Sequence, residues 1–341
     1  MAKLQTIFKL NKIILAIDTS FNDTTCAILK GNKVLSNIIY TSNKYNVFKG
    51  VIPNIAYNLH ITNIYDIVQR SLYKSKINIK KIDAISFTKG PGLIGSLMIG
   101  ENFAKSLSLS LNIPLIGVNH IHGHLFSIYL NKNQKFPNFP YLCLSISGGH
   151  TKLILINNIF TIKELGCTLD ENLGILFDKF SILLGFKYLE GPKKIEIYSK
   201  FGRFKYKIPI PNVKGLNFSF SGLLTYLKNK IKNKKINKKD LCRSFLETIF
   251  IILNNKINKA IKQTGINKVV ITGGVSSNNF LIYKFKKISK LNKWKYYRNN
   301  NKIYLKDNAA MIALIGQIKY FYKLYENYNT ISNSKLSLDI F

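Results

Sequence analysis

The stretch KIILAIDTS, residues 12–20, is an apolar run that ends in three polar residues. Such a run predicts a buried strand that leads into a tight turn. Residues 24–29 and 33–40 continue with two further strand patterns. The turn at 18–20 could offer backbone N–H groups and hydroxyls to a phosphate, or it could be an ordinary polar turn.

The same arrangement recurs near the middle of the chain. Residues 141–147 (YLCLSIS) predict a strand, Gly148-Gly149 a tight turn, and residues 151–156 a second strand. A two-glycine turn can wrap a phosphate, although a plain hairpin turn is its commoner use. Because helical patterns follow the strands in each half, the chain is expected to form two like α/β domains that face a cleft.

A domain division follows from these patterns. A polar, proline-bearing segment at 131–140 is typical of a boundary. We expect a loose basic extension at 1–12, a first α/β domain at 13–118 with about 308–330, a second α/β domain at 119–307, and a tail at 331–341.

Local patterns make four further predictions. Residues 168–172 (TLDEN) are expected to cap the helix that follows. Residues 186–216 lack a regular pattern, and residues 303–305 are expected to form a strand. His60 lies on a predicted helix, where a packed or capping role is commoner than metal ligation.

The amino-acid composition indicates which partners and which cellular compartment to expect. The formal net charge is +35, from 51 Lys+Arg and 16 Asp+Glu, which favours a polyanion such as nucleic acid. Nearly all basic residues are lysine, so part of this charge is typical of an AT-rich genome. The chain lacks a membrane-length apolar run and a signal-peptide pattern, and its four cysteines form no C-x-x-C pair. We therefore expect a cytoplasmic protein with reduced thiols and no membrane partner.

Three of the five histidines lie in NHIHGH, residues 119–124. On a helix, His120 and His124 lie on one face and can bind one divalent metal together with a carboxylate from elsewhere. A chance pair of ordinary helix histidines is the alternative. Zinc proteases of the H-E-x-x-H type carry a glutamate where this chain has Ile121, which argues against that class. Asp307, before the last predicted helix, is a candidate third ligand or a simple N-cap.

Glycine-rich turns follow two more predicted strands. Residues 89–96 (KGPGLIGS) and 273–278 (GGVSSN) each lead into a helix, where the backbone can approach a ligand or a neighbouring element closely. The second turn could seat a nucleotide. The first is neither a Walker A loop nor a G-x-G-x-x-G in the expected context.

Nine motifs in order resemble the universal tRNA N6-adenosine threonylcarbamoyltransferases, the bacterial TsaD type. They are IDTS (17–20), VIP (51–53) with His60, GPGLIG (90–95), HIHGH (120–124), SGGHT (147–151), FDK (177–179), FSFSG (218–222), GGVSSN (273–278) and DN (307–308). The resemblance covers about residues 12–320. It implies a two-domain actin/Hsp70/sugar-kinase-like (ASKHA) fold with a central cleft. It also implies transfer of a threonylcarbamoyl group from threonylcarbamoyl-adenylate to N6 of the adenosine next to the anticodon, in tRNAs that read codons beginning with A.

The resemblance further implies site residues and partners. His120, His124 and Asp307 match metal ligands, for Fe²⁺ by likeness to the family or for Zn²⁺, which suits the same ligands. His122, between them, is expected to face away from the metal. The positions that match adenylate-binding residues are Ser145, Ile146, Ser147, Gly148, Gly149, Asp178, Gly191 and Asn278. The implied partners are the tRNA anticodon arm, a TsaB-like paralogue and a small TsaE-like ATPase.

The chain departs from the family pattern at several positions. Asn22 stands where an aspartate thought to help catalysis is usual, so the catalytic residue is unassigned and Asp18 and Asp23 are the nearby candidates. YLEGP (188–192) replaces Tyr-Pro-Gly-Gly-Pro, and GILFD (174–178) replaces Gly-Glu-Ala-Phe-Asp. Three alternatives stay open: a metalloprotease, as the older family name O-sialoglycoprotein endopeptidase says, a phosphotransferase or ATPase of the same fold, and a non-catalytic assembly subunit.

Overall fold

The chain folds into two compact units. The structure, a computed structural model, describes residues 2–130, 135–232, 236–339 and 341. The first unit comprises residues 1–44, 51–136 and 299–341, and the second comprises residues 45–50 and 137–298. Among the residues that the structure describes, none of the helices has the length and apolarity that a membrane span needs.

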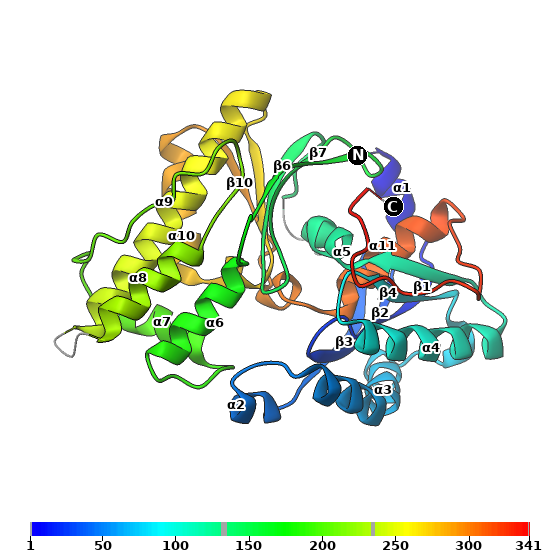
Figure 1. Cartoon of the computed structure of the whole chain (residues 1–341). Coiled ribbons are helices and arrows are strands. Elements are labelled where there is room, and N and C mark those ends of the chain that lie inside the picture. The colour runs from blue at the N-terminus through cyan, green and yellow to red at the C-terminus, as the bar shows by residue number, and fades with distance from the viewer. Residues whose placement is uncertain (1, 131–134, 233–235, 340) are drawn as a thin grey trace. The chain divides into compact units, whose positions relative to one another are not determined.

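A five-stranded mixed sheet, in the order β3-β2-β1-β4-β5, forms the centre of the first unit (Figure 1). Its strands are β1 (Ile13–Asp18), β2 (Asp23–Lys30), β3 (Lys33–Thr41), β4 (Ala84–Gly90) and β5 (Leu115–Asn119). Short turns join β1 to β2 and β2 to β3, so these pairs are antiparallel. Long helical connections precede β4 and β5, which therefore pair in parallel.

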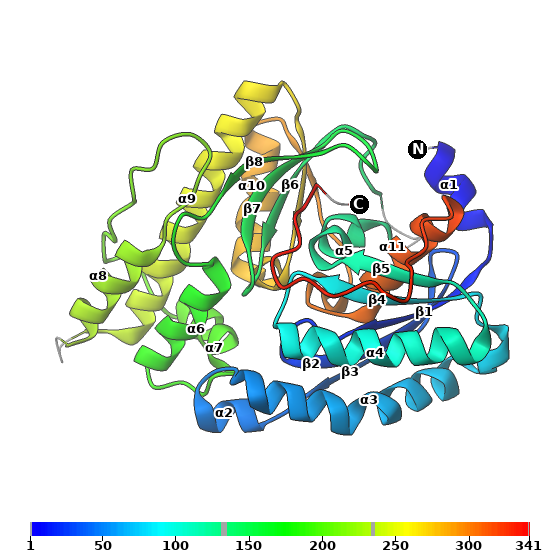
Figure 2. The same ribbon diagram turned by 45° about the vertical axis from the view of Figure 1, so that its right-hand side comes forward.

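Helices cover both faces of this sheet (Figure 2). Helices α3 (Pro53–Ser75) and α4 (Ile94–Leu111) lie on one face, with the short 3-10 turn η1 (Ile79–Lys81) after α3. Helices α5 (His120–Phe126) and α11 (Ala309–Phe321) lie on the other face. Because both faces are covered, β1 is buried along nearly its whole length, which explains its continuous apolar sequence.

The second unit repeats this topology in the order β10-β9-β6-β7-β8. Its strands are β6 (Tyr141–Ile146), β7 (Thr151–Ile156), β8 (Ile162–Cys167), β9 (Lys268–Thr272) and β10 (Lys295–Tyr297). As in the first unit, three strands form an antiparallel meander, and two parallel strands follow on the other side of the first strand. The predicted duplication is confirmed.

The other regular elements of the second unit are helices. Its helices are α6 (Leu173–Leu183), α7 (Gly191–Ser199), α8 (Ser221–Lys232), α9 (Lys238–Thr264) and α10 (Asn279–Leu291), with the 3-10 turn η3 (Gly274–Ser277). The short helix α2 (Lys44–Phe48) lies almost entirely in this unit. Aliphatic and aromatic side chains of all five helices pack against the sheet and form one core with it. This unit therefore buries its own apolar surface.

The start of the chain is more structured than the sequence predicts. Residues 2–9 form helix α1 rather than a loose extension, and α1 packs on α11. Leu4 and Ile7 lie one turn apart on this helix and are buried. The apolar pair is too short a pattern to reveal an amphipathic helix without the surface that it covers.

The end of the chain is likewise packed and does not form a free tail. Ser332 N donates a hydrogen bond to a carboxylate oxygen of Glu101 (2.7 Å). Leu336 and Leu338 are only 9% and 7% exposed. The described residues of this segment, 331–339 and 341, therefore belong to the first unit.

The predicted division into domains at 13–118 and 119–307 differs from the structure, whereas the predicted boundary segment 131–140 contains the observed boundary between residues 136 and 137. Residues 119–136 belong to the first unit, because α5 follows β5 directly and packs on α11. The chain leaves this unit within the polar segment 131–140. It returns at Asn299, whose side-chain amide donates to Ser127 O (2.7 Å), rather than near residue 308.

Two local predictions also need correction. Residues 302–305 form a 3-10 turn, η4 (Lys302–Leu305), instead of a strand. The side chain of Asn301 accepts a hydrogen bond from Ile303 N (3.0 Å) and so caps this turn. The segment 186–216 contains helix α7, which begins at Gly191-Pro192.

Leu336→Ala together with Leu338→Ala should lower the free energy of unfolding by roughly 2–4 kcal/mol, because both side chains are buried against the first unit. The matched control is Ile331→Ala in the same segment, since Ile331 is 74% exposed. Its effect should stay below about 0.5 kcal/mol. Urea unfolding measures both values, and equal effects of the two variants would contradict the packed segment.

Candidate functional site

Helix α5 carries three histidines and begins directly after β5. The side chain of Asn119 accepts a hydrogen bond from Ile121 N (2.9 Å) and caps the helix. The rings of His120 and His124 lie on one face, with centroids 4.8 Å apart. Gly123 lets α5 approach α11, because a Cβ there would lie 2.9 Å from a methionine side chain of α11. The cap and the glycine together set which face of α5 carries the two rings.

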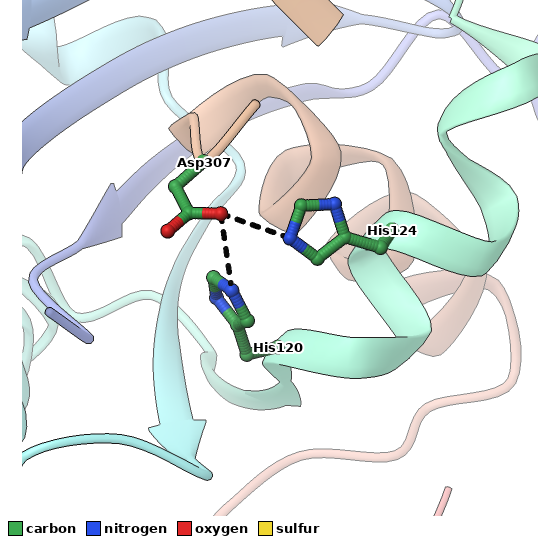
Figure 3. A group of neighbouring side chains, drawn as sticks. All are labelled: His120, His124 and Asp307. Carbon is green, nitrogen blue, oxygen red and sulfur yellow. Dashed lines mark hydrogen bonds and ion pairs between the residues drawn. The ribbon is translucent and has the colours of Figure 1, made fainter. Parts of the chain in front are cut away.

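Asp307 immediately precedes α11, and its carboxylate points at both rings (Figure 3). Asp307 Oδ1 lies 2.9 Å from His124 Nε2 and 3.5 Å from His120 Nε2. The N-cap of α11 is Asn308, whose side chain accepts from Met311 N (3.2 Å), so Asp307 is not needed as the cap. The ligand atoms of the three residues lie within 4.8 Å of one another, and this group could hold a metal ion.

Two carboxylates lie close to the ring of His120. Burial alone would lower the pKa of His120, but the carboxylates of Asp18 and Asp307 outweigh it and raise the pKa to about 10. Burial would raise the pKa of Asp307, whereas His120 and His124 hold it well below its usual range. The centre therefore favours a positive charge between the two carboxylates, which an imidazolium or a divalent cation supplies.

The donor set fits a metal such as Fe²⁺ or Zn²⁺, because it offers two imidazole nitrogens and one carboxylate oxygen. Behind His120, its Nδ1 lies 3.5 Å from Asp18 Oδ2 and 3.1 Å from Ser20 Oγ. A carboxylate in this position orients a metal-ligating histidine and sets its tautomer. Asp18 is itself held, since its Oδ1 accepts from Ser20 N (3.0 Å) and Thr88 Oγ1 (2.8 Å).

The two candidate catalytic carboxylates have different surroundings. Asp18 is 1% exposed and faces His120. Asp23 begins β2 and is partly exposed; its Oδ1 accepts from Asn22 Nδ2 (2.8 Å) and Thr41 Oγ1 (2.7 Å). Burial raises the pKa of Asp23 to about 7. Asn22 thus supports a neighbouring carboxylate instead of supplying one.

The other two histidines of the first unit contact protein groups. His60 is buried, and its ring nitrogens lie 2.8 Å from Thr24 Oγ1 and 3.1 Å from Phe21 O. These contacts tie α3 to β2 and to the turn before it, which is a packed role. His122 Nε2 lies 2.7 Å from Leu338 O, so this ring contacts the carboxyl-terminal segment and is not part of the metal group.

In the second unit, an open turn follows β6. A Cβ at Gly148 or Gly149 would meet no atom within 4 Å, so both backbones border open space. The start of α6 lies directly against this turn, because a Cβ at Gly174 would lie 2.5 Å from Gly148 N. A glycine turn beside a helix N-terminus offers backbone N–H groups to an anion.

Sequence reasoning missed His150. Its ring bridges two buried serines, with Nε2 2.7 Å from Ser145 Oγ and Nδ1 2.9 Å from Ser147 Oγ. His150 therefore orients both hydroxyls beside the glycine turn. The signal was present in SGGHT, where the histidine directly follows the two glycines.

The remaining predicted substrate-binding residues lie around α6, which contacts both α7 and η3. Asp178 lies on α6, where burial raises its pKa to about 7 in spite of a hydrogen bond from the Tyr188 hydroxyl. Gly191 begins α7 and packs so closely against Ser181 that any Cβ would clash. Asn278 caps α10 by accepting a backbone N–H. Gly191 and Asn278 thus each have a structural role as well.

Asp170 has a role that the predicted helix cap did not foresee. No side-chain hydrogen bond caps α6; the carboxylate of Asp170 instead accepts from Ser219 Oγ (2.5 Å), Phe220 N (2.8 Å) and Ser221 Oγ (2.8 Å) at the start of α8. Burial would raise the pKa of Asp170, but these hydrogen bonds hold it far below its usual range. The FSFSG motif is thereby tied to the segment before α6.

Comparison with known proteins identifies the family. The sequence model of the TsaD family, tRNA N6-adenosine threonylcarbamoyltransferase, matches residues 33–314. A protein of that name from Christiangramia forsetii is 40% identical over 332 residues, which cover 94% of this chain and 97% of that protein. The chain belongs to this family. TsaD-family proteins of the same name from Thermodesulfovibrio yellowstonii (42% identical; 90% and 94% covered) and Wigglesworthia glossinidia brevipalpis (38%; 96% and 98%) are similarly related.

Solved structures confirm the fold. HypF from T. kodakarensis superposes with a TM-score of 0.62 at 12% identity, over 95% of this chain and 49% of HypF. The activator of 2-hydroxyisocaproyl-CoA dehydratase from Clostridium difficile superposes with a TM-score of 0.53 at 12% identity, over 93% and 98% of the two chains. The predicted ASKHA-type fold of this TsaD-family chain is therefore confirmed.

Asp170→Ala should lower the free energy of unfolding at neutral pH by about 1 kcal/mol, since an exposed cap is partly screened by water. The pKa of Asp170 is lower in the folded chain than in the unfolded chain. Its stabilisation is therefore present above the unfolded pKa of about 4 and is lost as the pH falls through the folded pKa.

Urea unfolding at several pH values tests this prediction. The difference between wild type and Asp170→Ala should shrink as the pH falls from about 4 towards 2. Asp66→Ala removes a carboxylate from an exposed ion pair with Arg70 and serves as the control. A difference that does not change with pH would contradict the role of the ionised carboxylate.

Proposed function

We propose that this chain is a transferase that makes N6-threonylcarbamoyladenosine next to the anticodon of tRNAs that read codons beginning with A. The observation that carries the proposal is the group of His120, His124 and Asp307, in a chain that matches the TsaD family over most of its length. Threonylcarbamoyl-adenylate would be the donor, and the adenosine N6 amine would be the acceptor.

We assign one divalent metal to this group, Fe²⁺ by likeness to the family, with Zn²⁺ suited to the same ligands. A metal bound there would supply a Lewis acid for an oxygen of the threonylcarbamoyl group. Asp18 would act as a positioning residue, because it holds His120 from behind.

The second unit would bind the adenylate. The open turn at Gly148 and Gly149 would offer backbone N–H groups to its phosphate. His150 would hold the hydroxyls of Ser145 and Ser147 in a fixed orientation. The complete set assigned to adenylate binding is Ser145, Ile146, Ser147, Gly148, Gly149, Asp178, Gly191 and Asn278.

The reaction exchanges one bond for another. The N6 amine attacks the carbamoyl carbon, a C–N bond forms, the bond from that carbon to the phosphate oxygen breaks, and AMP leaves while N6 loses a proton. Because the leaving group is good and the amine is weak, catalysis depends mainly on holding both reactants in place. Since Asp18 is engaged with His120, Asp23 is the remaining candidate for the group that accepts the proton.

The partners follow from this assignment. A basic surface would hold the tRNA anticodon arm through its phosphates. A TsaB-like paralogue, a TsaE-like ATPase and a cytoplasmic location stay predictions from the family resemblance.

The purified chain, supplied with its partner proteins, threonine, bicarbonate, ATP and a tRNA that reads an A-initial codon, should form the modified nucleoside. Nucleoside digestion followed by mass spectrometry measures the product. Loss of a metal ligand in His124→Ala should lower the rate at least about 100-fold.

The control for this experiment is Asp66→Ala, an exposed carboxylate of α3 whose loss should leave product formation unchanged. Absence of product from the wild type, with metal bound and partners present, would contradict the proposal and favour a non-catalytic assembly role.

A further inference from the structure

The second unit exposes a segment in which aromatic and basic residues alternate. Residues 200–207, KFGRFKYK, follow α7 and contain no acidic residue. Phe201 is 70% exposed and Phe204 is 53% exposed. Their basic neighbours, Lys200, Arg203, Lys205 and Lys207, are all exposed. The segment therefore presents two apolar rings within a cluster of positive charge.

The backbone of this segment is anchored to α9. Arg203 N donates to Asp240 Oδ1 (2.8 Å), and Lys205 N donates to Ser244 Oγ (3.2 Å). Gly202 lies so close to Lys239 O that a Cβ there would clash. The anchoring uses backbone groups and a glycine, so the exposed rings and basic side chains are not needed to hold the segment in place.

The charges of these four basic side chains are available to a binding partner. Within the described part of the chain, none of the four forms an ion pair with an acidic residue. Lys239 adds a further cation, with its Nζ 5.7 Å from the centre of the Phe201 ring. A partner for this surface must therefore carry negative charge and also offer groups that stack on an aromatic ring.

Unpaired nucleotides have both properties. Their bases stack on aromatic side chains, and their phosphates pair with Lys and Arg. A base-paired duplex keeps its bases stacked inside and can offer only phosphates. An acidic protein surface would match the charge but not the two exposed rings.

The position of the segment also suits a nucleotide substrate. Helix α7 begins at Gly191, one of the residues assigned to adenylate binding, and ends where residues 200–207 begin. A helix of nine residues is about 14 Å long, so one rigid element separates the two.

We propose that residues 200–207 form a stacking and phosphate-binding surface for unpaired nucleotides of the tRNA anticodon loop. This inference rests on the proposed function for the identity of the RNA. It adds specific residues, Phe201 and Phe204 for stacking and Arg203 and Lys205 for phosphates, to which no role was assigned above.

Binding of a labelled anticodon stem-loop RNA to the full chain tests the stacking part. Phe201→Ala with Phe204→Ala should weaken binding at least about 10-fold, because each stacked base adds to the affinity. The variant should leave the salt dependence of binding, and the affinity for a fully paired RNA, unchanged. Tyr283→Ala is the matched control, since Tyr283 is an exposed aromatic residue of the same unit (63%) and lies outside the segment.

The charge part has its own readout. Arg203→Gln with Lys205→Gln should reduce the slope of log affinity against log salt by about 1 to 2. Lys80→Gln with Lys81→Gln, in the first unit, is the control and should leave the slope unchanged. An equal reduction by the control pair would show that only the overall charge matters, and it would overturn the assignment.

Unchanged affinity of the Phe201→Ala, Phe204→Ala variant for the stem-loop would overturn the proposal, as would an equal loss for paired RNA. The same holds if polyglutamate competes with the stem-loop for the wild type but not for this variant, since that would indicate an acidic protein partner. The binding assay needs neither the donor nor partner proteins. If the chain binds the RNA through Phe201 and Phe204 but forms no product, the result would therefore contradict the proposed function and leave this inference standing.

Discussion

The candidate metal site of the first unit depends on bringing two imidazole rings and one carboxylate close together. His120 and His124 are set by the start of α5, and Asp307 is set by the start of α11, so the contact between these helices decides the geometry. Gly123 makes that contact close. Asp18, at the end of β1, completes the arrangement behind His120. A displacement of either helix would separate Asp307 from the two histidines, which is why α5 and α11 must pack together although His124 and Asp307 are 183 residues apart in sequence.

The duplicated topology places different chemistry at equivalent positions. In each unit the first strand ends in a polar turn: Asp18 and Ser20 in the first unit, and Ser145 and Ser147 in the second. The first turn supports a histidine that belongs to the metal group. The second turn is held by its own histidine, His150, and borders open space at two glycines. One repeated scaffold thus supports a candidate cation-binding group in one unit and a candidate anion-binding turn in the other.

The sequence predicted those features that follow from local patterns. The strand repeat and the histidine spacing both depend on short-range periodicity, and the structure contains them. Asp307 could be proposed as a ligand but not separated from an N-cap, because that requires knowing that Asn308 caps α11. The packed ends, the return of the chain to the first unit at Asn299 and the contacts of Asp170 depend on partners distant in sequence. Such tertiary contacts leave no periodic signal, so one sequence could not reveal them.

The metal content of the purified chain tests the central claim most directly. The account predicts about one iron or zinc per wild-type chain, and loss of most of it in His120→Ala with His124→Ala. His150→Ala, which removes a buried histidine of the second unit, should keep the metal. Circular dichroism confirms that each variant is folded. Equal metal content in wild type and the folded double variant would contradict the assignment of His120, His124 and Asp307 as a metal site.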